Sequence, residues 1–203
     1  MNFKIVIAIL SLSILVGCNK FIIEPKVESK VETNPFSLED MCIINTKDSG
    51  EICYGMNRND AEKTLGAVLE EGKSTVLYDH KVNIGYSDEK VYSIHLGVGS
   101  EGIYKTTRGA EIGLHKEDIK KLYGSKEGIE LGETELTYLF NMEKEAYYES
   151  MDEYFEEIKS VLNQAEDDTE KLQDIFQFSI GIGPDGLVDS LYMKDARGYE
   201  VVY

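Results

Sequence analysis

The sequence has few basic residues for its length. Its 203 residues include 21 Lys and Arg against 38 Asp and Glu, so the formal net charge is −17 at pH 7. A chain this acidic repels the phosphates of nucleic acids and has no basic patch to offset the repulsion. DNA and RNA are therefore excluded as expected partners. Apolar residues make up 42% of the chain, which is enough to build a core and excludes a wholly disordered chain.

The motifs of the common enzyme and cofactor-binding classes are also missing. There is no G-x-S-x-G elbow, no phosphate-binding P-loop and no C-x-x-C pair. The three histidines, His80, His95 and His115, share no H-x-x-x-H spacing and have no cysteine nearby, so we predict no zinc site. We expect no catalytic residue, no metal and no cofactor. The prediction is a protein that is not an enzyme, with a hydrolase of unrecognised type as the alternative.

Two strings match the pattern G-x-G-x-x-G, at residues 97–102 and 181–186. A dinucleotide-binding loop needs a helix directly after its glycines, so that the helix N-terminus faces the pyrophosphate. The segments that follow here, residues 103–106 and 187–190, are instead typical of strands. We interpret both strings as hairpin glycines and exclude nucleotide binding.

The N-terminus has one lysine, Lys4, followed by an uncharged apolar run over residues 5–16. This run has the length of a signal-peptide core and is too short for a membrane-spanning helix, which needs about 20 apolar residues. Residues 15–18, with the sequence LVGC, resemble the lipobox of bacterial lipoproteins. The resemblance implies cleavage before Cys18, a lipid on the Cys18 sulfur, and a domain outside the cytoplasm, anchored to the cell membrane or outer membrane. An ordinary signal peptide and a buried strand are the alternatives.

Composition divides the N-terminal part into three segments. Residues 1–17 are the predicted signal peptide, and residues 18–35, which lack a sustained period, are a predicted flexible tether. Residues 36–54 contain Cys42 and Cys53 on either side of a predicted turn, and we expect an N-terminal hairpin there. Outside the cytoplasm these cysteines can form a disulfide, which stabilises the fold by roughly 3 kcal/mol in the chain-entropy model. We predict the disulfide, and two buried free thiols are the alternative.

An internal repeat governs the fold prediction. Residues 55–66 align without gaps on residues 113–124, and the two copies share their outer glycines, a cation, an aspartate and a lysine. Each copy predicts a short helix. Asn57 is a suitable N-cap, and Gly66 and Gly124 stand where a left-handed C-terminal cap is needed.

The similarity continues in the strands after each helix. Residues 76–78 correspond to 136–138, and residues 91–96 match 188–193 position by position. Each of the later segments follows a strand and a polar turn, which is a hairpin signal. We therefore predict an α+β fold of two tandem helix-plus-antiparallel-strand repeats that form a sheet with helices packed on one face.

Repeat 1 is expected over residues 55–108 and repeat 2 over residues 109–203. Residues 103–107 and 199–203 are the predicted final strands of the two repeats. The second repeat carries an insertion at residues 143–174, whose apolar residues recur at helical spacing while carboxylates occupy the opposite face. We predict a long packing helix with a solvated acidic face.

The repeated pattern is a glycine, a hydrophobic residue, a cation and an aspartate, followed by strands that end in V-x-S and a hydrophobic residue. It resembles the repeat of small envelope lipoproteins of the SmpA/OmlA (BamE-like) type. Its duplication over residues 51–203 resembles the tandem-repeat fold of the β-lactamase inhibitor protein. The resemblance implies a sheet that binds a protein partner through its helix-free face or its loops. It transfers no catalytic or binding residue, because the matching positions are caps and turns.

Tyrosine is common, with 13 residues in a chain that lacks tryptophan. Five tyrosines fall in predicted strands: Tyr86, Tyr92, Tyr104, Tyr138 and Tyr192. We expect some of them in the core and the rest on the uncovered sheet face, where a rigid aromatic side chain loses little entropy on binding a partner.

The sequence thus predicts a lipid-anchored, non-enzymatic protein-binding module of the bacterial cell envelope, acting in envelope assembly or maintenance. It would contact the membrane through the lipid on Cys18 and a protein partner through residues that the sequence does not identify. The alternative is a surface-exposed lipoprotein that binds or inhibits a host or competitor protein.

Overall fold

The computed structural model describes residues 35–164 and 168–198, all within the unit Val31–Tyr203. The helices are α1 Arg58–Thr64, α2 Lys116–Tyr123 and α3 Met151–Gln164, with 3-10 turns η1 Leu38–Met41, η2 Asp79–Lys81, η3 Asp168–Asp174 and η4 Ala196–Gly198. The strands are β1 Cys42–Asn45, β2 Glu51–Cys53, β3 Val68–Glu71, β4 Thr75–Tyr78, β5 Val82–Ser87, β6 Lys90–Gly97, β7 Tyr104–Thr106, β8 Ile129–Glu130, β9 Glu135–Asn141, β10 Ala146–Tyr147, β11 Ile175–Ile182 and β12 Val188–Asp195. None of the helices in the described ranges is long and apolar enough to cross a membrane.

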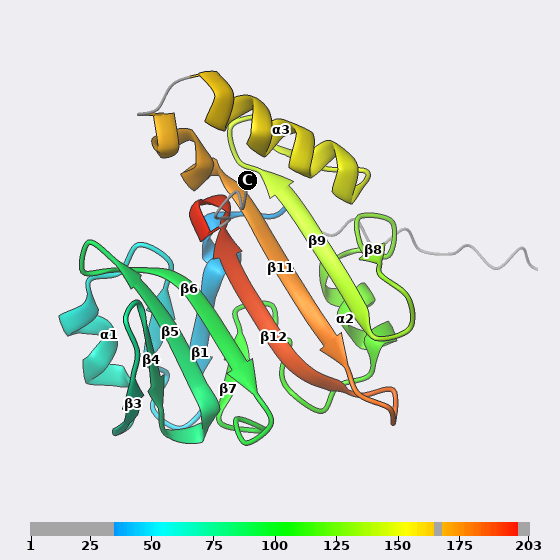
Figure 1. Ribbon diagram of the computed structural model, residues 1–203. Helices are drawn as coiled ribbons and strands as arrows, with labels where there is room; N and C mark the ends of the chain where they lie inside the picture. Colours follow the sequence, from blue (N-terminus) through cyan, green and yellow to red (C-terminus); the bar gives the residue numbers. More distant parts are fainter. Residues whose placement is uncertain (1–34, 165–167, 199–203) are drawn as a thin grey trace, which may run out of the picture. The chain divides into compact units, whose positions relative to one another are not determined.

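The described strands form two antiparallel sheets. Nine strands make the large sheet, in the order β10-β9-β11-β12-β6-β5-β4-β3, with β8 also paired to β9 (Figure 1). The other three make a small sheet in the order β2-β1-β7. The fold is therefore α+β, as the sequence predicted.

The strands that correspond in the two predicted repeats lie in the two halves of the large sheet. Strands β4, β5 and β6 of the first correspond to β9, β11 and β12 of the second. The loops before α1 and α2 contact the last strands in the same way: Gly55 N donates to Val91 O at 2.7 Å, and Gly113 N donates to Val188 O at 2.8 Å. These four residues are equivalent in the gapless alignments of the sequence, so the repeat extends to individual hydrogen bonds.

The two central strands of the large sheet, β6 and β12, are related by an approximate twofold axis. His95 of β6 lies directly opposite Tyr192 of β12, and the repeat alignment makes the same two residues equivalent. From this pair outward the strands follow in the same order on both sides, β6-β5-β4 and β12-β11-β9. An approximate twofold axis therefore passes through the His95–Tyr192 pair.

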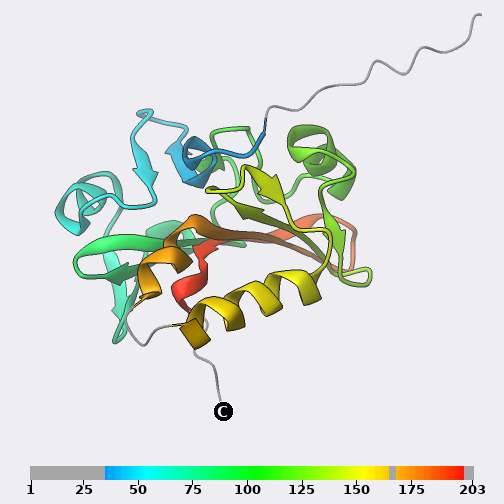
Figure 2. The same ribbon diagram turned by 90° about the horizontal axis from the view of Figure 1, so that it is seen from above.

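Helices lie on both faces of the large sheet (Figure 2). The repeat helices α1 and α2 pack on one face together with the small sheet, and they bury the equivalent residues Ala61 and Ile119 in the main core. The inserted helix α3 lies on the opposite face, where Tyr154 and Ile158 form a second apolar cluster with Leu139 of β9. The repeat helices thus share one face as predicted, and the insertion covers one end of the other face.

The segment before repeat 1 is bonded to the rest of the domain. A disulfide joins Cys42 and Cys53 across the β1–β2 hairpin, with the Cα atoms 4.1 Å apart. Arg108 donates from Nε to Asp40 Oδ1 at 2.5 Å and from Nη2 to Asp40 Oδ2 at 2.6 Å. Nη2 also donates to the carbonyl of Pro35 at 2.8 Å. The point where the predicted tether enters the domain is therefore held by the loop after β7.

Three predictions of local structure need correction. Gly66 is not a left-handed cap, because α1 already ends at Leu65. Leu65 has an extended backbone with φ −76°, and its side chain is buried. Gly124, with φ +99°, does end α2. Asn57 stands at the N-cap of α1, but its side chain makes no capping hydrogen bond.

Residues 103–107 supply β7, which pairs with β1 in the small sheet, so this strand does not extend repeat 1. The predicted strand at 199–203 lies outside the described residues.

Candidate functional site

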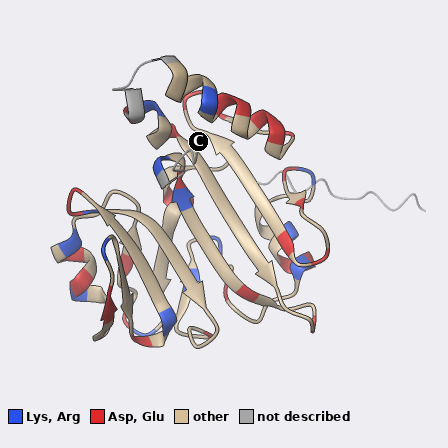
Figure 3. Ribbon diagram, viewed as in Figure 1, with Lys and Arg blue, Asp and Glu red and all other residues tan. Residues whose placement is uncertain are grey.

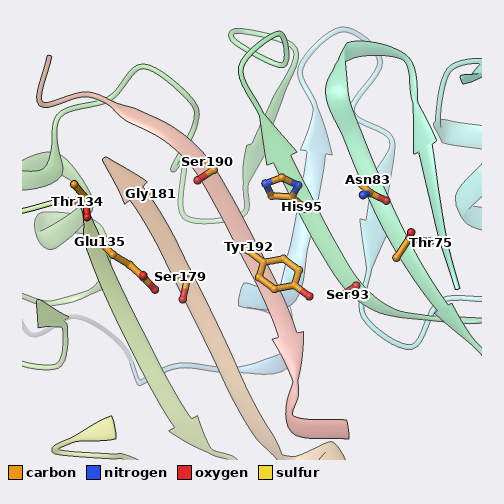
Figure 4. A pocket seen from close by; sticks show the side chains of 10 residues that line it. All are labelled: Thr75, Asn83, Ser93, His95, Thr134, Glu135, Ser179, Gly181, Ser190 and Tyr192. Carbon is orange, nitrogen blue, oxygen red and sulfur yellow. The ribbon is translucent and has the colours of Figure 1, made fainter. Parts of the chain in front are cut away.

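The face of the large sheet opposite α1 and α2 is covered by α3 at one end, and its uncovered part forms a groove. The cavity has a volume of about 440 Å³ and is lined from six strands (Figure 4). The lining residues are Thr75, Asn83, Ser93, His95, Thr134, Glu135, Ser179, Gly181, Ser190 and Tyr192. Most of them carry a hydroxyl, amide or imidazole group. We call this cavity the open-face groove.

The lining residues of the open-face groove are related by the repeat. Asn83 lies opposite His95 in the β5–β6 pair, and Ser179 lies opposite Tyr192 in the equivalent β11–β12 pair. The equivalent pairs are Thr75 and Glu135, Asn83 and Ser179, Ser93 and Ser190, and His95 and Tyr192. The groove is therefore centred on the approximate twofold axis, with matching positions from each repeat on either side.

Two glycines shape the floor of the groove. Gly85 lies opposite Ser93, and Gly181 lies opposite Ser190. A Cβ atom on either glycine would overlap the hydroxyl oxygen of the serine opposite. Glycine therefore allows the serine side chain of one strand to lie against the backbone of the next, which is a common reason for a glycine within a strand.

A β-bulge lies next to each of these glycines. The pairing shifts by one residue after Gly85 and after Gly181, which leaves Tyr92 in β6 and Asp189 in β12 as the extra residues. The side chain of Tyr92 lies over Gly85, and the carboxylate of Asp189 lies over Gly181. The bulges thus place one further side chain from each repeat on the groove side of the sheet, as bulges near binding sites often do.

Hydroxyl groups on the repeat 2 side form a chain of hydrogen bonds. Gln177 Nε2 donates to Ser179 Oγ at 2.7 Å, Ser179 Oγ lies 2.8 Å from Thr137 Oγ1, and Thr137 Oγ1 donates to Glu135 Oε1 at 2.8 Å. Because the Thr137 hydroxyl proton is directed to Glu135, Ser179 is the donor to Thr137. These hydrogen bonds all run in one direction and end on the carboxylate of Glu135. The side chains are therefore held in place before any ligand binds.

The two central rings of the groove are uncharged at neutral pH. His95 and Tyr192 meet edge to face, with ring centroids 5.8 Å apart. Burial lowers the pKa of His95 below its ordinary value of 6.5, because desolvation disfavours the imidazolium. Burial also raises the pKa of Tyr192, and a hydrogen bond from Ser93 partly offsets the effect. The middle of the groove therefore presents a neutral aromatic surface.

Asn83 contributes an unmatched polar atom. Its side-chain Oδ1 is buried and has no hydrogen-bond partner among the residues that the structure describes. A buried acceptor without a donor costs about 1–3 kcal/mol. Asn83 Oδ1 is therefore an unused acceptor, whereas the hydroxyl of the equivalent Ser179 is hydrogen-bonded to Thr137 and Gln177.

The residues singled out in the sequence are distributed over the whole domain. Cys18 lies outside the described residues. Tyr86, Tyr104 and Tyr138 are buried in the main core. Tyr192 lines the groove, and the half-buried Tyr92 lies beside it. The five strand tyrosines are thus divided between the core and the uncovered face.

The histidines and glycine-rich strings are placed by the strands around them. His95 lines the groove, whereas His80 and His115 are exposed in η2 and before α2. Residues 181–186 form the β11–β12 hairpin, as interpreted. Residues 97–102 connect β6 to β7, which pair in different sheets, so this string is a turn but not a hairpin. In residues 35–164 and 168–198, no three His, Cys, Asp or Glu side chains are grouped to hold a metal ion.

Sequence reasoning did not identify the groove. It considered His95 as a zinc ligand and gave no role to Ser179. The repeat alignment contained the signal, because it places His95 and Tyr192 at equivalent positions, each two residues after a serine. What the alignment lacked was the pairing of the two copies at the centre of one sheet.

Known proteins do not identify this chain. No protein-family model, curated protein or solved structure matches this chain. The resemblance to the SmpA/OmlA type and to the β-lactamase inhibitor protein therefore stays a prediction from the sequence pattern.

Proposed function

We propose that this chain is a lipid-anchored, non-enzymatic protein-binding module of the bacterial cell envelope, and that its partner docks in the open-face groove. The groove is the observation that carries the proposal. It lies on the approximate twofold axis of the domain, and a network of hydrogen bonds holds part of its lining in place. Its centre offers the half-buried ring of Tyr192, and aromatic side chains of this kind often dominate binding energy at protein interfaces.

The N-terminal segment supports the anchoring part of the proposal. Residues 15–18 resemble a lipobox, and a lipid on Cys18 would hold the module at the cell membrane or outer membrane. The tether enters the domain at Pro35, on the Arg108 side chain. A role in assembly or maintenance of the envelope follows from this location combined with a binding surface.

Site-specific photocrosslinking tests the docking site. A photoreactive residue at Ser179, inside the groove, should give a discrete adduct in living cells, and the variant Tyr192→Ala should reduce its yield about tenfold. The matched control is the same residue at Leu38, which is 51% exposed and belongs to η1. The same adducts from both positions, or a yield from Ser179 that Tyr192→Ala leaves unchanged, would contradict docking in the groove.

A second candidate is an outward-facing lipoprotein that binds or inhibits a host or competitor protein. The duplicated architecture favours it, because the same duplication resembles an inhibitor protein. Protease treatment of intact cells separates the two candidates. Cleavage of the domain supports the outward-facing role, and full protection supports a role inside the envelope.

A further inference from the structure

Two carboxylates lie on either side of Gly181, a lining residue of the open-face groove: Glu135, which also lines it, and Asp189, at its edge. Glu135 of β9 is directly opposite Gly181, and Asp189 of β12 lies over it from the other neighbouring strand. Both side chains are half-buried. Each accepts one hydrogen bond from a hydroxyl, Glu135 from Thr137 and Asp189 from Ser190. Neither forms an ion pair with any residue in the described ranges, so two acidic groups share this end of the groove without a counter-charge.

The repeat shows that this acidity is specific to one end. The residues equivalent to Glu135 and Asp189 are Thr75 and Tyr92, so the same positions of the first repeat are neutral. Figure 3 shows the central strands largely free of charge, with acidic segments on β9 and β12 at the ends farther from α3. The charged side chains therefore do not follow the approximate twofold symmetry of the backbone. An occupant would bind in one orientation.

Two lysines lie near this face of the sheet. The side chain of Lys81 lies against Gly97, the residue opposite Ser190, and no ion pair joins it to Glu135 or Asp189 in the described ranges. Lys194 lies nearer α3, where its ammonium is 5.6 Å from the centroid of the Tyr192 ring. It is paired in register with Ser93, on the far side of the central His95–Tyr192 row from the carboxylates. Lys194 therefore leaves Glu135 and Asp189 uncompensated.

The dimensions of the groove indicate a chain segment as its occupant. Asn83 and Glu135 stand on β5 and β9, which are four strand positions apart in the sheet. At 4.7–4.9 Å per strand, this is roughly 19 Å along the sheet. About six residues of extended chain span such a length.

We propose that the open-face groove takes an extended, basic segment of the partner protein, with a Lys or Arg side chain held between Glu135 and Asp189. This inference rests on the proposed function and specifies the chemistry of its partner. The cation would neutralise the two unpaired carboxylates in a half-buried site, where a charge-assisted hydrogen bond is stronger than a neutral one. A main-chain N–H of the same segment would reach Asn83, and the neutral centre would contact its apolar side chains.

The first test is the photocrosslink from Ser179, formed with the full chain in cells. The double variant Glu135→Gln/Asp189→Asn should reduce the adduct about tenfold. The control Glu51→Gln/Glu70→Gln removes the same charge at two exposed residues outside the groove and should leave the adduct unchanged. Because Glu135 and Asp189 have no cation to lose, the double variant should melt at the same temperature as the parent chain or higher, so loss of binding is not loss of fold.

The second test uses defined probes on the purified full chain. N-acetyl-arginine methylamide should shift the amide NMR signals of Gly181 and its neighbours, whereas the uncharged N-acetyl-norleucine methylamide should not. The double variant should abolish the shifts. Equal shifts from the two probes would overturn the cationic assignment.

The crosslinking outcomes separate the two proposals. If Tyr192→Ala abolishes the adduct and neutralising the carboxylates leaves it intact, the partner docks in the groove but the basic segment is wrong. If Tyr192→Ala has no effect, the docking site itself is wrong and the basic segment is rejected with it. Loss of the adduct in both variants, together with an arginine-specific shift, supports both.

Discussion

The imidazole of His95 meets the ring of Tyr192 edge to face, with centroids 5.8 Å apart, at the point where the two repeats pair. Residues that the repeat alignment makes equivalent thus lie against each other at the centre of the open-face groove. Because the two repeats differ in sequence, the pair consists of an imidazole whose pKa is lowered by burial and a phenol whose pKa is raised by burial. The pair therefore gives the domain a defined response to acid.

The stability of the folded domain should fall as the pH drops below about 6.5. Desolvation is the cause of the lowered His95 pKa, so the unfolded chain takes up this proton at a higher pH than the folded chain does. The contribution of neutral His95 to the free energy of unfolding is complete above pH 6.5. It is lost as the pH falls through the pKa that His95 has in the folded domain. Urea midpoints at pH 7.5 and pH 5.0 should differ more for the parent chain than for His95→Gln. Equal differences would show that His95 does not contribute.

Removal of the disulfide should destabilise the domain by about 3 kcal/mol, because Cys42 and Cys53 are 11 residues apart and their bond restricts the unfolded chain. Urea unfolding of Cys42→Ala/Cys53→Ala against the oxidised parent measures this difference. Reductant should lower the midpoint of the parent and leave that of the double variant unchanged. A variant as stable as the parent would mean that the bond contributes nothing.

Removal of one partner of the Arg108–Asp40 ion pair should strongly destabilise the domain. The two side chains are only 14% and 6% exposed, so Asp40→Ala leaves a buried cation and should cost about 3–5 kcal/mol. Replacing both partners, as Asp40→Leu/Arg108→Met, should cost less than the single change. Asp60→Ala breaks an exposed pair with Lys63 and should have little effect in the same denaturation series. A single variant as stable as the double would contradict this account.

Gly181→Ala should destabilise the domain by about 1–3 kcal/mol, because its Cβ would overlap the hydroxyl of Ser190. Adding Ser190→Ala removes that oxygen and should recover part of the loss. Gly97→Ala is the control, since the nearest atoms to its added Cβ are 3.8 Å away. Thermal unfolding of these chains and of Ser190→Ala alone measures the coupling. If Ser190→Ala gives no recovery, another contact makes Gly181 necessary.

Much of the fold was accessible from local patterns. The repeat predicted both short helices, and alternating apolar residues predicted the hairpin strands β5–β6 and β11–β12. The helix over the insertion followed from apolar spacing. Caps were less predictable: Gly66 matches Gly124 in the alignment, yet Leu65 leaves α1 in an extended conformation because its side chain enters the core.

The groove required information that no local pattern contains. The sequence does not say which face of the sheet receives α3, because its apolar stripe fits either face. Nor does it say that β6 and β12 pair with each other, since antiparallel strands with similar alternation can pair in several orders. The groove results from both facts together, because it is the part of the face that α3 leaves uncovered at the junction of the repeats.

The sequence by itself determined the α+β class and the hairpin position of the two bonded cysteines, and it predicted the duplicated plan, because these depend on periodicity and spacing along the chain. Only the tertiary structure decided that His95 meets Tyr192, that the insertion lies opposite the repeat helices, and that Glu135 and Asp189 share one end of a groove. These relationships join residues about 50 to 100 positions apart. They depend on how complete strands and helices pack, and the same local preferences are compatible with other packings.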